Sequence, residues 1–87
     1  MKLNVRAFAL VFALLWGGLA MLLTGLANLV WPSYGRAFLD VMASVYPGYH
    51  ATRNLAQVMI GTLYGVLDGG IGGALTAALY NRFVAHN

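Results

Sequence analysis

Residues 7–30 of the chain read AFALVFALLWGGLAMLLTGLANLV, and residues 55–80 read LAQVMIGTLYGVLDGGIGGALTAALY. The first stretch carries no charged side chain, and the second carries only Asp68. A helix over the 24 residues of the first stretch would be roughly 36 Å long, enough to cross a hydrocarbon core about 30 Å thick. Because every backbone polar group in lipid needs an internal partner, the sequence predicts two transmembrane helices.

The composition of the whole chain agrees with this prediction. Of the 87 residues, 61% are apolar and only 8% are charged, whereas about a quarter of a soluble domain is charged. There is no cysteine, and His50 and His86 stand far apart in the sequence. We therefore expect no catalytic residue, no metal site and no cofactor, and the protein is not predicted to be an enzyme. The net charge of +3 is accounted for by the flanks of the spans and does not indicate nucleic-acid binding.

The first span could instead be a cleaved signal peptide. Lys2 and Arg6 would form its basic region, and residues 18–20 offer a small-x-small cleavage site. The apolar stretch continues well past Ala20, however, where the core of a signal peptide would already have ended. We expect an uncleaved membrane anchor.

The positions of the basic residues predict the orientation. Lys2, Arg6 and Arg82 lie outside the connecting segment, and Arg36 and Arg53 lie within it. Since basic residues are enriched on the cytoplasmic side, both termini are expected in the cytoplasm. Residues 1–87 would form a single membrane domain.

The segment between the spans predicts a short amphipathic helix over residues 34–46. Trp31-Pro32 ends the first span, Ser33 could cap the short helix, and Pro47-Gly48 stops it. We expect this helix to lie flat at the membrane surface as a cover; a helix that docks a partner is the alternative. The aromatic residues expected at the two membrane surfaces are Trp31, Tyr34, Tyr46, Tyr49 and Tyr80.

Small residues recur at helical spacing in both spans and predict close helix packing, in the manner of a glycine zipper. The candidate packing residues are Ala13, Gly17, Ala20 and Thr24 in the first span and Gly61, Gly65, Gly69, Gly72, Gly73 and Thr76 in the second. The two stripes could face each other within one hairpin. The second span is small on more than one side, however, which favours a further helix from another copy or from a larger partner. The glycines after Asp68 could also kink the span, with Asp68 capping the following half.

Asp68 is the one charged side chain in the middle of a span. On a helix it shares a face with Gln57 and Tyr64, and Gly17 of the first span is expected at the same depth. A charged Asp at the bilayer centre costs about 2.5–3.5 kcal/mol on insertion scales. We weigh three roles: a neutral hydrogen-bonded bridge to Tyr64, a backbone carbonyl or another copy; a partner for a basic group of another protein; and part of a proton or cation path.

Several short motifs resemble those of a known family. They are the opening Met-Lys-Leu-Asn-Val, Trp16-Gly17-Gly18, the segment 44–49 (SVYPGY), Leu63-Tyr64-Gly65, Asp68-Gly69, Ile71-Gly72-Gly73 and the segment 79–83 (LYNRF). With these motifs the chain resembles a family of small bacterial two-span membrane proteins often labelled bacteriophage holins. The resemblance covers nearly the whole chain and implies a hairpin in the bacterial inner membrane, with an important Tyr-Gly-x-x-Asp-Gly segment.

Together these observations predict an all-α membrane protein: a two-transmembrane-helix hairpin with a short interfacial amphipathic helix in the loop. The expected function is that of a self-associating, holin-like protein that acts by helix packing and could form pores. The alternative is a non-catalytic accessory subunit of a larger membrane complex. The expected partners are the lipid bilayer and either copies of this chain or the subunits of such a complex.

Overall fold

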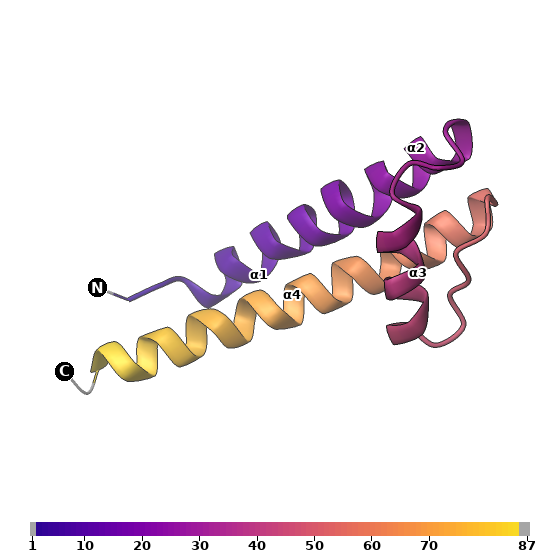
Figure 1. The fold of residues 1–87 in the computed structure, drawn as a ribbon. Helices are drawn as coiled ribbons and strands as arrows, with labels where there is room; N and C mark the ends of the chain where they lie inside the picture. The colour runs from indigo at the N-terminus through magenta and orange to yellow at the C-terminus, as the bar shows by residue number, and fades with distance from the viewer. Residues whose placement is uncertain (1, 86–87) are drawn as a thin grey trace.

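The computed structural model describes residues 2–85, and all regular structure within them is helical (Figure 1). The elements are α1 (Val5–Ala13), η1 (Leu14–Leu23), α2 (Thr24–Val30), α3 (Arg36–Val45) and α4 (Leu55–Ala85). The first three join end to end into one helix, Val5–Val30, of 26 residues, and α4 has 31. Both long helices are apolar enough to cross a membrane by length and composition. The prediction of an all-helical chain with two such helices is confirmed.

The bounds of the first long helix follow from its flanking residues. It begins after Asn4, whose side-chain oxygen accepts a hydrogen bond from the backbone N–H of Ala7 at 3.0 Å. It ends at Val30, because Pro32 forces Trp31 into an extended conformation (φ −122°, ψ 91°). Its middle section, η1, is π-helical, a wider turn that the sequence did not reveal.

The two long helices lie side by side and run in opposite directions, so that the beginning of α1 lies near the end of α4 (Figure 1). Asn81 near the end of α4 joins these ends. Its side-chain oxygen accepts a hydrogen bond from the Leu3 N–H at 2.5 Å, and its amide nitrogen donates to the Leu3 carbonyl at 2.7 Å. The side-chain amide of Asn81 thereby satisfies both the N–H and the carbonyl group of Leu3, which lies outside the helix.

One face of α4 makes the contact with the first helix. Its buried residues are Val58, Gly61, Gly65, Gly69, Gly73 and Ala77. A Cβ atom added to Gly73 would lie 2.5 Å from the carbonyl oxygen of Phe8, and one added to Gly17 would lie 2.7 Å from the backbone nitrogen of Val66. The helix backbones therefore approach so closely that only glycine fits, and the glycine faces meet within one chain.

The register of this face departs from the expected stripes. In α4 it continues through Gly73 rather than Gly72, and Thr76 is exposed. In the first helix Gly17 is buried, and the neighbouring buried positions are Met21 and Gly25. Ala13, Ala20 and Thr24 are only half-buried. Residues four positions apart lie on the same face of a helix, so this face can contact an antiparallel neighbour along its length. Gly73 lies four residues after Gly69 and therefore continues the face, whereas Gly72 does not.

Helix α4 remains α-helical through the glycine cluster, without the break that the glycines could have produced. Packing against the first helix supports the backbone there, which outweighs the poor helix propensity of glycine. Asp68 consequently caps no helix end and lies in the middle of a continuous helix.

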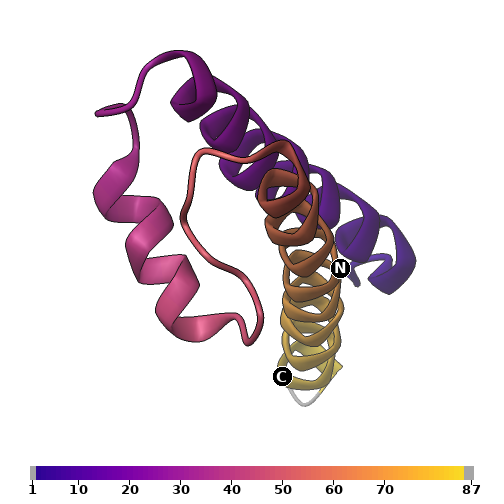
Figure 2. The same ribbon diagram turned by 90° about the vertical axis from the view of Figure 1, so that its right-hand side faces the viewer.

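Helix α3 crosses the helix pair near its loop end and lies on one side of it (Figures 1 and 2). It begins one residue after Gly35, which has a left-handed conformation (φ 64°), and not after a Ser33 cap. At its other end Tyr46 is extended before Pro47, and Gly48 has φ 81°. The Tyr49 N–H donates to the Tyr46 carbonyl at 3.2 Å, which closes a tight turn with Pro and Gly at its centre.

Candidate functional site

The central feature is a chain of two hydrogen bonds that links three separate elements. Trp16 Nε1 of η1 donates to Tyr46 Oη at 2.8 Å. Tyr46 Oη in turn donates to Asp68 Oδ2 of α4 at 2.9 Å. The direction of the chain is fixed by chemistry, because an indole N–H can only donate and the phenol has a single proton to give. Asp68 Oδ2 is therefore the acceptor of the Tyr46 hydroxyl group.

The turn after α3 places Tyr46 in this chain. The ring of Tyr46 stacks on that of Tyr64, with centroids 4.9 Å apart and an interplanar angle of 11°. Tyr64 Oη donates to the carbonyl oxygen of Pro47, the next residue of the turn. Trp16, the donor to Tyr46, packs edge-on against Phe38 of α3, with ring centroids 5.9 Å apart. These contacts hold the Tyr46 ring in the position from which its hydroxyl group donates to Asp68.

A small apolar core lies behind the site and holds α3 against the helix pair. Its buried members are Met21, Leu39, Tyr46 and Tyr49. Tyr49 lies directly over Gly61, where an added Cβ would be 2.8 Å from its ring carbon Cε1. The glycine face of α4 thus accommodates the loop as well as the first helix.

The environment of Tyr46 favours the neutral phenol. Burial raises the pKa of Tyr46 above its usual value of 10.0, and the acceptor Asp68 raises it further, while the hydrogen bond from Trp16 lowers it. Burial likewise raises the pKa of Tyr49, with a smaller contribution from the charge of Asp40. The phenol therefore keeps its proton and can continue to donate to Asp68.

The Asp68 side chain itself is exposed at the surface of the chain. Tyr46 contacts one carboxyl oxygen, and within residues 2–85 no hydrogen bond to Oδ1 is formed. One turn further along α4 an added Cβ on Gly72 would meet open space, and Thr76 after it is exposed. We call Asp68, Gly72 and Thr76 the outer strip. It has a polar side chain at each end and a glycine at its centre, and no other segment of residues 2–85 packs on that glycine.

Large apolar side chains surround the outer strip. Ile71 and Leu75 expose 61% and 58% of their surface, and Leu63, Leu67 and Leu79 are similarly exposed. These fractions are typical of a surface that faces lipid or another apolar helix and would be unfavourable in water. The carboxyl group of Asp68 is thus a polar point in a broad apolar surface.

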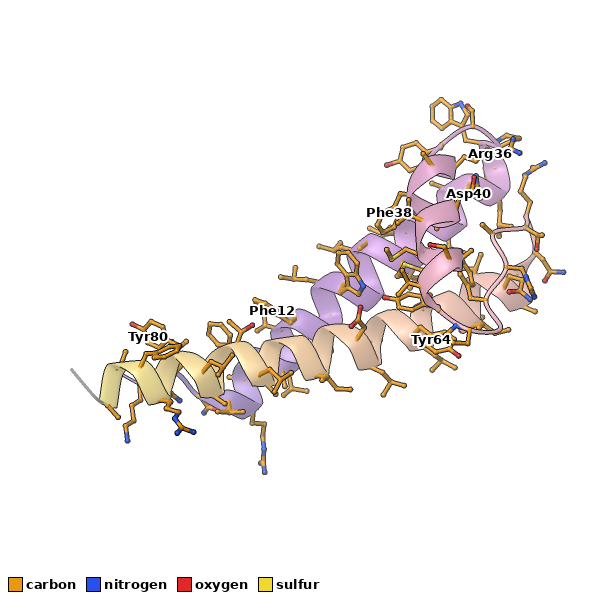
Figure 3. The ribbon with its side chains drawn as sticks, turned by 60° about the horizontal axis from the view of Figure 1, so that its bottom comes forward. Phe12, Arg36, Phe38, Asp40, Tyr64 and Tyr80 are labelled. Carbon is orange, nitrogen blue, oxygen red and sulfur yellow. The ribbon has the colours of Figure 1, made fainter. Side chains whose placement is uncertain are left out.

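The remaining predicted polar and aromatic residues lie in two places. Gln57 accepts a hydrogen bond from the His50 N–H at 2.7 Å, outside the hydrogen-bonded chain of Asp68. Trp31 and Tyr34 stack at 6.3 Å and are 66% and 50% exposed at the loop end. Tyr80 is 45% exposed near the opposite end of α4 (Figure 3). These three exposed aromatics lie at the two ends of the helix pair, and their place at the membrane surfaces stays a prediction.

Tyr46 and Tyr49 differ from the expected belt, because only 5% and 4% of their surface is exposed. The turn at Pro47-Gly48 directs both rings toward the helix pair. The sequence pointed to no polar partner for Trp16, and Tyr64, a backbone carbonyl and another copy were the candidates for a neutral hydrogen-bonded bridge to Asp68. Trp16, Tyr46 and Asp68 all lie within the motifs quoted for the family resemblance. Their shared presence in those motifs was the one feature of the sequence that could have linked them.

Comparison with protein-family models, curated proteins and solved structures gives no match to this chain.

Proposed function

We propose that the protein is an integral membrane hairpin that associates with a second copy of itself through the outer strip, in the manner of a holin-like protein. The hydropathy and length of the two long helices support membrane insertion. In that placement α3 and the stacked Trp31 and Tyr34 rings lie at one membrane surface, and Tyr80 lies at the other. Helix packing, and not covalent chemistry, is the activity.

The exposed carboxyl group of Asp68 is the observation that carries this proposal. A group of this kind facing hydrocarbon costs several kcal/mol when charged and remains unsatisfied when neutral. The adjoining glycine, Gly72, is unfavourable in a helix unless another helix approaches closely. Among residues 2–85, no atom of a neighbouring segment lies within 4 Å of a Cβ placed there. A second helix against the outer strip resolves both costs.

A symmetric contact fits the geometry of the strip. Two copies inserted with the same topology place identical residues at the same depth, so a two-fold axis along the membrane normal brings Asp68 opposite Asp68. Two bare carboxylates would repel each other strongly there, and the contact therefore requires a proton between them. Oδ1 of one copy then donates to the carboxyl group of the other, while each Oδ2 continues to accept from Tyr46.

Cross-linking tests this proposal, because the chain has no cysteine of its own. A Thr76→Cys variant carries one thiol on the outer strip, and a Leu14→Cys variant carries one at a position that is 70% exposed on the first helix. Oxidation in vesicles should form disulfide dimers of the Thr76→Cys protein at low protein density. Equal cross-linking of both variants would reveal random collision and would refute a specific strip contact.

Substitution of Asp68 separates the possible partners. Asp68→Asn keeps a donor and an acceptor, so the hydrogen bond between the copies and the dimer should survive. Asp68→Leu removes both groups and should weaken the dimer. Loss of assembly in the Asn variant would instead indicate a charged partner. Leakage of ions from vesicles containing only the wild-type protein would extend the proposal to pore formation.

The second candidate is an accessory subunit of a larger membrane complex. The observation that favours it is that the glycines at 61, 65, 69 and 73 are all used within the chain, so that a narrow strip remains for association. A basic side chain of another protein could meet Asp68 there. Such a subunit would co-purify with its complex and would not cross-link to itself.

The hydrogen-bonded chain argues against a proton path along it. Trp16 stands at its donor end, and an indole can neither accept a proton nor pass one on at neutral pH. A relay through Tyr46 would therefore stop at Trp16. The chain is better suited to holding Asp68 in one position for a neighbouring helix.

A further inference from the structure

A second polar site lies at the loop end, away from Asp68. It is a cleft of about 310 Å³ between the end of the first long helix and the loop. Its lining residues are Asn28, Pro32, Arg36, Ala51, Thr52 and Arg53. Two side chains in this lining are positively charged and none is acidic.

Arg53 is held in place by the end of α2. Its Nε donates to the carbonyl oxygen of Asn28 at 3.2 Å, and its Nη2 donates to that of Leu29 at 2.5 Å. These carbonyls lie at the C-terminal end of a helix, where a cation is favourable. Since a guanidinium group has five N–H donors, Arg53 keeps further donors for a ligand in the cleft.

Arg36 supplies the second charge from the start of α3 (Figure 3). Asp40 lies one turn further along α3 and does not line the cleft. Two guanidinium groups in one cleft repel each other, and an anion between them removes that repulsion. Their planar donors match the oxygens of a phosphate group, and the hydroxyl group of Thr52 can add another donor.

We propose that this cleft binds a phosphate group, either that of an anionic phospholipid or a free phosphate ion. The exposed Trp31 and Tyr34 rings are close by in sequence at the same end of the molecule. Aromatic side chains of this kind gather at the headgroup level of a bilayer. Only the lipid source depends on the proposed membrane placement, because the cleft and its charges belong to the fold itself.

The test measures ligand binding to the full chain in a non-ionic detergent, under dilute conditions, by native mass spectrometry. The probes are phosphatidylglycerol, a diacylglycerol with the same acyl chains and no phosphate, and inorganic phosphate. Arg36→Gln should weaken phosphatidylglycerol binding about fivefold, and Arg36→Lys should lose less. Arg82→Gln, the matched control at the other end of α4, should bind as the wild type does.

Two results would overturn the proposal: equal binding in the Arg36→Gln and Arg82→Gln proteins, or diacylglycerol binding as tight as that of phosphatidylglycerol. Displacement of phosphatidylglycerol by inorganic phosphate would identify a site that also takes the free ion. Retention of the lipid at high phosphate concentration would identify a headgroup site. Since the titration needs no dimer, failure of the outer-strip contact would leave its result interpretable.

Discussion

The glycine face of α4 allows a prediction with opposite signs at two neighbouring positions. In a Gly69→Ala variant the new Cβ would meet the carbonyl oxygen of Phe12 and lie 2.8 Å from the Cβ of Trp16. These obstacles include backbone, so the two helices must move apart, and overpacking of this kind costs about 1–3 kcal/mol. The better helix propensity of alanine stabilises the folded state by about 1 kcal/mol. We expect a net loss of up to about 2 kcal/mol.

Gly72→Ala is the matched control, because the same methyl group there meets open space. In the single chain it should therefore stabilise the fold by up to about 1 kcal/mol. The gain in helix propensity is common to both variants, so they should differ by the overpacking cost alone, about 1–3 kcal/mol.

Unfolding in mixed micelles with increasing SDS measures this difference. Protein is kept dilute so that only single chains contribute, and the fluorescence of Trp16, which packs between the helices and α3, follows the transition. A Gly69→Ala protein as stable as the Gly72→Ala protein would refute the close backbone contact. Destabilisation by both changes would show that Gly72 also packs within the chain.

Three further results are expected from the polar contacts. Tyr46→Phe removes the hydroxyl group between Trp16 and Asp68 and should destabilise the docking of α3 by about 1–3 kcal/mol. This loss would be measured as faster amide hydrogen exchange in residues 36–45. Unchanged exchange would contradict the anchoring role of Tyr46. Because the folded state raises the pKa of Tyr46, its contribution to stability is complete below pH 10.0 and falls as the pH rises through the raised value; this alkaline loss should be smaller in Tyr46→Phe, and an identical pH profile would count against it. Asn81→Ala should increase exchange at the Leu3 amide and leave the α3 amides as they are, since it removes the contact that joins the two ends.

The sequence was sufficient to predict the helices because their signals are local. Charged residues bound the two long apolar runs that form the spans. Pro32 ends the first helix and Pro47 ends α3, and each proline affects only the few residues next to it. The π-helical section was not predictable, since nothing in the composition of residues 14–23 distinguishes it from an ordinary α-helix. The choice between Gly72 and Gly73 was also open, because both fit helical spacing and only the position of the first helix decides between them.

The candidate site was predictable only in part. Asp68 stood out as the single charge within an apolar run, and its neighbours on the same helix could be named from helical periodicity. Its actual partner, Tyr46, lies 22 residues away along the chain and reaches it only because α3 folds back across the helix pair. A tyrosine next to a proline in a loop is equally consistent with a membrane-surface residue, so the tertiary contact left no distinctive pattern.

The oligomeric state in a near-native membrane tests the central claim most directly. Protein extracted with a mild detergent would be analysed by native mass spectrometry, alongside a Gly72→Ile variant that fills the outer strip. We expect a homo-oligomer with no other stoichiometric chain in the wild type, and a folded monomer in the variant. A wild-type monomer, or a fixed stoichiometry with larger subunits, would contradict self-association through Asp68 and Gly72.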